Sequence, residues 1–85
     1  MINQIHILRK IKWRVERKKT LVVQLSEEDT YKGGSLRVWE NEKNPYITAS
    51  KKIGNTIIFD SGHYHEVTTL EVGTRYALIC WLEPN

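Results

Sequence analysis

The stretch that decides the fold runs from Gly54 to Leu82 and reads GNTIIFDSGHYHEVTTLEVGTRYALICWL. It contains three runs rich in β-branched and aromatic residues, at 56–59, 63–70 and 74–82. Runs of this kind, bounded by Asp, Ser and Gly, are typical of β-strands. We predict a turn at 71–73, which would make the last two runs neighbouring strands.

The same pattern continues upstream. Apolar and polar residues alternate over 11–16, as in a half-buried strand. Further short strands are predicted at 21–25, 35–39 and 46–49, and the pair Gly33-Gly34 indicates a tight turn or a bulge. No helical period and no internal repeat occurs. The sequence therefore predicts an all-β sandwich or barrel of antiparallel strands, with residues 1–85 as a single domain.

The composition is that of an ordinary soluble protein, with 40% hydrophobic and 27% charged residues. The single cysteine, Cys80, lies in an apolar run, and we expect it to be a core residue. One cysteine cannot form an internal disulfide, and neither a membrane-spanning stretch nor a signal peptide is recognisable. We expect the protein to be cytoplasmic.

The formal net charge of +3 comes mainly from a basic stretch between Arg9 and Lys19. Such a cluster can contact phosphates, and a small basic β-barrel that binds nucleic acid is one hypothesis for it. The preferred interpretation is a solvated strand face and turn. No aromatic platform or helix-turn-helix pattern accompanies the basic residues.

The side chains best suited to chemistry follow the strand at 56–59. His63 and His65 are two positions apart and can share one strand face, where two imidazoles can bind a metal. The alternative is that one packs and the other faces solvent. With a turn at 71–73, Arg75 would lie about four residues from His65, or roughly 13 Å along the strand. A five-carbon dicarboxylate bound to a metal could span much of that distance and pair with the guanidinium. The alternative for Arg75 is an exposed strand residue.

An ordered set of motifs adds to this interpretation. Tyr31-Lys32-Gly33-Gly34-Ser35-Leu36 is followed by Gly54 to Ser61, then by His65-Glu66-Val67, then by Gly73-Thr74-Arg75 and Trp81. In order and spacing, residues 21–82 resemble the C-terminal half of an iron(II)/2-oxoglutarate oxygenase of the prolyl 4-hydroxylase-like group. That resemblance implies a partial double-stranded β-helix of the jelly-roll or cupin-like kind.

The resemblance also implies roles for individual residues. His65 matches the distal histidine ligand of Fe(II), and Arg75 matches the residue that pairs with the far carboxylate of 2-oxoglutarate. A facial triad also needs a His-x-Asp pair about a dozen residues before Leu21. His6 lies at about that distance and is the candidate second ligand, but Leu8 stands where the aspartate is expected. No His-x-Asp or His-x-Glu occurs anywhere in the sequence.

The resemblance implies hydroxylation of a C–H bond, with Fe(II) and 2-oxoglutarate as cofactors and peptidyl proline as the family's best-known substrate. Because the His-x-Asp pair is missing, we expect the chain to be inactive as it stands, and we assign no catalytic acid or base. The alternative is a non-catalytic β-helix relic or binding module. A cupin-type metal site fits poorly, because neither Glu66 nor Glu71 has the spacing from the two histidines that cupins use.

Overall fold

A computed structural model describes residues 3–13, 17–43 and 45–84 of the chain. The described residues form eight strands and one 3₁₀ turn, without an α-helix, so the predicted all-β class is confirmed. The elements are β1 (Asn3–Trp13), β2 (Lys19–Gln24), η1 (Glu28–Thr30), β3 (Tyr31–Gly33), β4 (Leu36–Trp39), β5 (Ile47–Thr48), β6 (Thr56–Asp60), β7 (Tyr64–Val67) and β8 (Leu70–Pro84).

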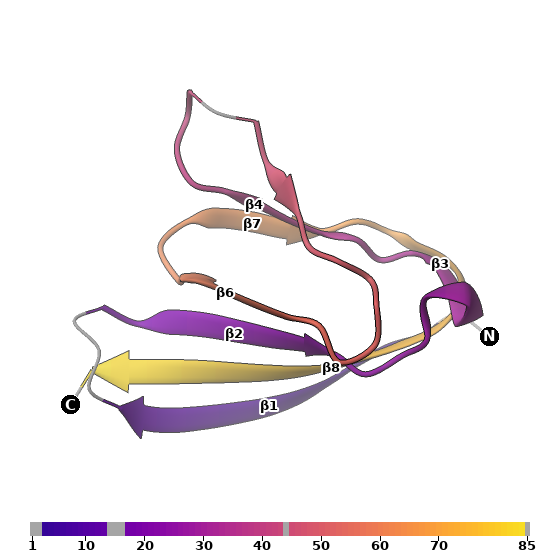
Figure 1. The fold of residues 1–85 in the computed structure, drawn as a ribbon, viewed down its shortest axis with the longest axis horizontal. Helices are drawn as coiled ribbons and strands as arrows, with labels where there is room; N and C mark the ends of the chain where they lie inside the picture. Colours follow the sequence, from indigo (N-terminus) through magenta and orange to yellow (C-terminus); the bar gives the residue numbers. More distant parts are fainter. Residues whose placement is uncertain (1–2, 14–16, 44, 85) are drawn as a thin grey trace.

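The strands form two sheets that face each other, as in a jelly roll. The larger sheet has the order β1-β8-β2-β6, with β3 added along another part of β8. The smaller sheet has the order β5-β4-β7. In Figure 1, β1, β8 and β2 lie below β4 and β7, and the chain passes between the sheets near β3. The long strand β8 is central, because it pairs with β1, β2 and β3.

One pairing differs from the predicted antiparallel arrangement. Strand β1 runs parallel to β8, with a register from Asn3 opposite Thr74 to Trp13 opposite Pro84. The other strand pairs are antiparallel. The parallel pair arises because β1 and β2 lie on either side of β8 and run in opposite directions, as Figure 1 shows. The pattern of side chains in β1 is compatible with either direction, so the sequence did not reveal it.

The predicted turn at 71–73 was wrong. The chain continues as one strand from Leu70 to Pro84, and Gly73 lies within it, opposite Tyr31 of β3. Gly73 has a φ of 85°, and a Cβ atom there would overlap the carbonyl oxygen of Thr30. Glycine is therefore needed for close approach of two backbones rather than for reversal of the chain. As a result, β7 and β8 belong to opposite sheets and are not a hairpin.

The predicted irregularity at Gly33-Gly34 is confirmed. The register between β3 and β8 shifts between Lys32 and Gly33, and both glycines have positive φ. A bulge bends the strand that contains it, and here the chain passes from β3 into β4 of the other sheet.

The core lies between the sheets and takes side chains from both. The larger sheet contributes Val22, Phe59 and Ala77, and the smaller sheet contributes Leu36 and Val38. In β2, buried and half-buried residues alternate strictly, which places Val22 and Gln24 on the inner face. Cys80 is a free, buried thiol, in agreement with the expected core role. No helix in the described part of the chain is long and apolar enough to cross a membrane.

Candidate functional site

A cavity of about 120 Å³ between the two sheets is lined by His6, His65 and Arg75, the three residues to which the family resemblance gave roles. His6 comes from β1, His65 from β7 and Arg75 from β8. The remaining wall is mostly apolar and consists of Thr20, Val22, Leu36, Phe59, Val67, Ile79 and Trp81. Two histidines and one arginine thus line the same cavity, although 69 residues separate His6 from Arg75 in the sequence. Arg75 is buried, whereas both histidines are exposed.

Arg75 is the most deeply buried large side chain, with 1% of its surface exposed. Its Nη2 donates a hydrogen bond of 2.7 Å to Oε1 of Gln24. Its Nη1 lies 3.2 Å from Oε1 of Gln4 and 3.2 Å from Nε2 of His6. The Nε atom is buried and has no partner among the described residues. The alternative of an exposed arginine on the strand surface therefore does not hold.

The shell around this guanidinium is neutral. Within the described residues, the salt bridges involve other basic side chains, and none joins Arg75 to a carboxylate. Burial lowers the pKa of Arg75, and the phenol of Tyr31 opposes this effect in part. An arginine remains protonated in proteins, and a buried cation without a counter-ion is costly. The arrangement therefore favours an anionic ligand, for which the bidentate geometry of a carboxylate is well matched.

Sequence reasoning missed the residues that hold Arg75 in place. Gln24 accepts from Arg75 and donates through Nε2 to the hydroxyl of Tyr31, at 2.7 Å. Both Gln24 and Tyr31 are 6% exposed. A signal was present, because Gln24 is a polar residue in the run 21–25, which otherwise consists of Leu and Val. The contact of Gln4 depends on pairing across 71 residues and leaves no local signal.

The His65 ring is oriented by two neighbours. Its Nδ1 lies 2.8 Å from the carbonyl oxygen of His63, and its ring packs on Phe59 with centroids 4.9 Å apart. A carbonyl oxygen only accepts, so in the neutral ring Nδ1 is the protonated nitrogen and Nε2 has the lone pair. That tautomer is suited to metal ligation through Nε2, because a hydrogen bond at the other nitrogen is the usual support for a ligating histidine.

His6 has a different environment. Its Nε2 accepts from Nη1 of Arg75, so this lone pair is already engaged. Burial, followed by the positive charge of Arg75, lowers the pKa of His6 and favours the neutral ring. The candidate second metal ligand is thus part of the shell around the guanidinium.

The residues present do not complete an iron site of the facial-triad kind. The described part of the chain contains no group of three His, Cys, Asp or Glu side chains close enough to hold a metal. Leu8, at the position expected for the aspartate, is 55% exposed on β1. His6 and His65 face the cavity, but a carboxylate does not join them there.

His63 and His65 do not share one strand face, which was one of the two arrangements that the sequence left open. His63 lies in the turn before β7, where its amide donates to the carbonyl of Asp60. It lines two other cavities and not the one that contains His65. The strand begins one residue later than the pattern suggested, so the two rings are not in equivalent strand positions.

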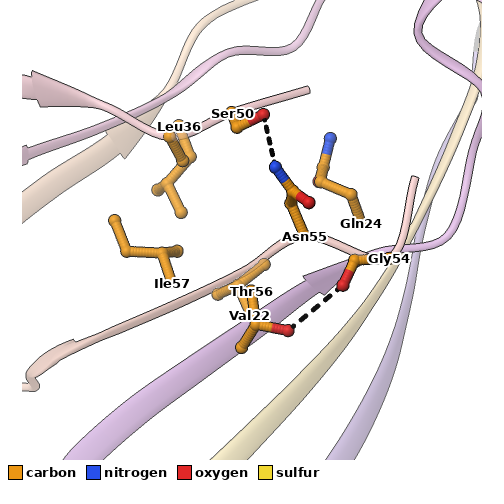
Figure 2. Close-up of a pocket in the computed structure, with 9 residues that line it drawn as sticks. Val22, Gln24, Leu36, Ser50, Gly54, Asn55, Thr56 and Ile57 are labelled. Atoms are coloured by element: carbon orange, nitrogen blue, oxygen red, sulfur yellow. Dashed lines mark hydrogen bonds between the residues drawn. The ribbon is translucent and has the colours of Figure 1, made fainter. Parts of the chain in front are cut away.

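A second cavity of about 400 Å³ lies beside the first and shares Val22 and Leu36 with it. Figure 2 shows its amide and hydroxyl groups, among them Asn55, whose Nδ2 donates to the hydroxyl of Ser50 at 2.8 Å. Charged side chains are absent from its described lining. Of the two, only the smaller cavity offers a charge for an ionic ligand.

Part of the basic stretch is paired with acids. Arg17 and Lys19 lie 3.3 and 3.7 Å from Oδ2 of Asp60, and Lys18 lies 3.8 Å from Oε1 of Glu83. The side chains of residues 9–16 lie outside the described part of the chain. These ion pairs agree with a solvated surface, and nucleic-acid binding stays an untested hypothesis.

Comparison with known proteins gives one family. Residues 5–83 match the model of the 2OG-Fe(II) oxygenase superfamily. Two proteins of Acinetobacter baumannii are similar over 81 residues at 27% identity, namely PKHD-type hydroxylase A1S_0473 of strain ATCC 17978 and PKHD-type hydroxylase ABSDF3031 of strain SDF. Each match covers 95% of this chain but 35% of the relative, so the chain spans about a third of their length. No solved structure is significantly similar.

Proposed function

The chain belongs to the 2OG-Fe(II) oxygenase superfamily, and from that membership we propose that its inter-sheet cavity binds 2-oxoglutarate through Arg75. The observation that carries the proposal is the buried guanidinium, which is 1% exposed and lacks a carboxylate partner among the described residues. The distal carboxylate of the cosubstrate would supply the missing counter-charge. Gln24 would hold Arg75 in orientation.

At the level of the family, the cofactors are Fe(II) and 2-oxoglutarate. When both are bound, they supply the oxidant for a C–H bond, and the protein supplies orientation and a dry pocket. In this chain, His65 is the side chain best prepared to hold a metal, since the hydrogen bond at Nδ1 leaves the Nε2 lone pair of the neutral ring for ligation. We derive no step through iron, because the described residues do not provide the carboxylate of a facial triad.

The activity proposed is hydroxylation, with residues 1–85 acting as one β-domain of a larger catalytic unit. The carboxylate ligand would then come from outside the described residues. Peptidyl proline is the candidate substrate, and the support for it is the similarity to PKHD-type hydroxylases. We propose a cytoplasmic location on the basis of the single, buried cysteine.

A ligand series tests the proposed binding site. We expect calorimetry to show that the protein binds 2-oxoglutarate at least about tenfold more tightly than 2-oxobutyrate, because hydrogen bonds between charged groups contribute about 1.5–3 kcal/mol. 2-Oxobutyrate keeps the oxoacid end and lacks the distal carboxylate. Equal affinities for the two ligands would refute the role of Arg75.

A second candidate is a non-catalytic module that binds the dicarboxylate alone. The observation in its favour is that Leu8 stands where the aspartate ligand is expected and that Nε2 of His6 already accepts from Arg75. Anaerobic titration with iron(II) in the presence of 2-oxoglutarate separates the two candidates. A weak visible charge-transfer band indicates a metal centre. Its absence, with binding of 2-oxoglutarate intact, indicates the binding module.

A further inference from the structure

The outer face of the smaller sheet has a cluster of aromatic side chains that the proposed oxygenase site does not use. In β4, Val38 is 2% exposed and points into the core, so Arg37 and Trp39 lie on the outer face. Trp39 is opposite Tyr64 of β7 in the register, and Tyr46 lies before β5 on the other side. Tyr64 is 68% exposed and Tyr46 is 41% exposed. These rings do not contribute to the interior core.

The rings meet edge to face. The centroids of Trp39 and Tyr64 are 5.0 Å apart with an interplanar angle of 66°, and those of Trp39 and Tyr46 are 5.1 Å apart at 62°. Edge-to-face contact is a favoured arrangement of aromatic pairs, so the two contacts hold the ring of Trp39 in a defined position beside both tyrosines.

A cavity of about 480 Å³ opens at the Tyr64 end of this cluster. Its lining includes Trp39 and Tyr64 as aromatic walls and Glu40 and Glu42 as acidic groups. We call these four residues the aromatic notch. The other described lining residues are Asn41, Gly62 and His63, and no lysine or arginine is among them. No ion pair joins Glu40 or Glu42 to another described side chain.

The opposite end of the same cluster already holds a cation. The guanidinium carbon of Arg37 lies 4.7 Å from the ring centre of Tyr46, within cation–π range. Arg37 also pairs with Glu66 at 3.5 Å. The ring of Tyr46 therefore already contacts an internal cation, while the Tyr64 end of the cluster combines aromatic walls with two carboxylates.

We propose that the aromatic notch binds an organic ammonium ion. Aromatic walls attract a cation through the ring quadrupole, and methylated ammonium groups suit them because such groups are weakly hydrated. Glu40 and Glu42 would supply the counter-charge. Both a free quaternary ammonium compound and a methylated lysine side chain present this chemistry. The inference is independent of 2-oxoglutarate binding.

Binding can be measured by NMR on the full chain, with the indole N–H of Trp39 as the reporter. Choline is the probe, and 3,3-dimethyl-1-butanol is its neutral counterpart of equal shape. We expect choline to bind at least about fivefold more tightly than the alcohol.

Nα-acetyl-trimethyllysine amide tests whether the ligand is instead a methylated lysine side chain. A tighter affinity for this amide than for choline assigns the site to a peptide side chain, and the reverse assigns it to a free small cation.

Variants locate the site. Trp39→Leu should weaken choline binding at least about tenfold. Trp39→Phe should bind choline more tightly than Trp39→Leu does, because it keeps an aromatic ring. The double change Glu40→Gln and Glu42→Gln should weaken binding about threefold or more and reduce its salt dependence. Tyr76→Leu removes an exposed ring from the other sheet and should have no effect. Equal binding of choline and the alcohol, or no saturable shift with either cation, would overturn the proposal.

Discussion

At the scale of single residues, the molecule is organised around a buried arginine in a neutral shell. Arg75 is held by the oxygen of Gln24, which in turn is fixed by Tyr31. Gln4 and His6 approach from β1. Neutral acceptors orient a guanidinium without cancelling its charge, so the charge remains available to an anion that enters the cavity.

Gln24 gives the sharpest test of this arrangement. In Gln24→Glu, a carboxylate would lie against Arg75 and act as an internal counter-ion, because the present oxygen is 2.7 Å from Nη2. We expect the affinity for 2-oxoglutarate to fall at least about tenfold, since the ligand must displace a formed ion pair. Calorimetry gives the affinity. Undiminished binding by the glutamate variant would contradict the account.

Gln24→Leu is the matching variant for stability. It leaves Nη2 of Arg75 and the hydroxyl of Tyr31 without their buried partner. We expect the free energy of unfolding to fall by about 2 kcal/mol. Urea denaturation measures this change, and a leucine variant as stable as the parent would show that the hydrogen bonds are replaced by others.

At the scale of elements, the sequence revealed most strands but not how they pair. The predicted runs at 21–25, 35–39 and 56–59 overlap β2, β4 and β6, because alternation and β-branched residues are local signals. The direction of β1 and the continuity of β8 through Gly73 were not visible. Both depend on partners far away in the chain, so a local glycine was interpreted as a turn.

At Gly33 the chain leaves β3 and continues into β4 of the smaller sheet, and the backbone contact there can be tested by mutation. A Cβ atom at this position would overlap the carbonyl oxygen of Thr69, and the φ is 80°. We expect Gly33→Ala to destabilise the fold by about 2–3 kcal/mol, because both the conformation and the space are unsuited to alanine.

Gly54→Ala is the matched control, because Gly54 has a similar φ of 83° but open space around its Cα. Gly54→Ala should lower the free energy of unfolding by about 1 kcal/mol, because only the backbone conformation is unfavourable for alanine there. Equal losses for the two variants in urea denaturation would show that the close approach at Gly33 is unimportant.

Asp60, the last residue of β6, contacts the turn that follows through Gly62 and contacts β2 through Lys19. Its Oδ1 accepts from the amide of Gly62, and this bond, together with Arg17 and Lys19, holds the pKa of the carboxyl below its ordinary value. A lowered pKa means that the unfolded chain binds the proton more readily. The stabilisation is therefore present above about pH 4 and is lost as the pH falls below it.

The corresponding prediction concerns Asp60→Asn. Denaturation midpoints of the parent should fall more steeply than those of the variant between about pH 4 and pH 2. A parallel decrease in both proteins would contradict the role assigned to this carboxylate.

At the scale of the whole molecule, the candidate site exists only where the two sheets meet. The family motifs pointed to His65 and Arg75, and the structure brings both to one cavity together with His6. The sequence alone could not show that Gln4 and His6 would reach Arg75, since their contacts span 71 and 69 residues. The fold therefore brings a buried arginine and two histidines to one cavity, while the described residues add no carboxylate.

The most direct test of the central claim is a calorimetric titration of 2-oxoglutarate into the parent protein and two arginine variants. Arg75→Gln removes the buried charge, and Arg37→Gln removes a charge from the outer face of the other sheet. The account predicts saturable binding by the parent and by Arg37→Gln, with affinity at least about tenfold lower in Arg75→Gln. Equal affinity in all three proteins, or no binding by the folded parent, would contradict it.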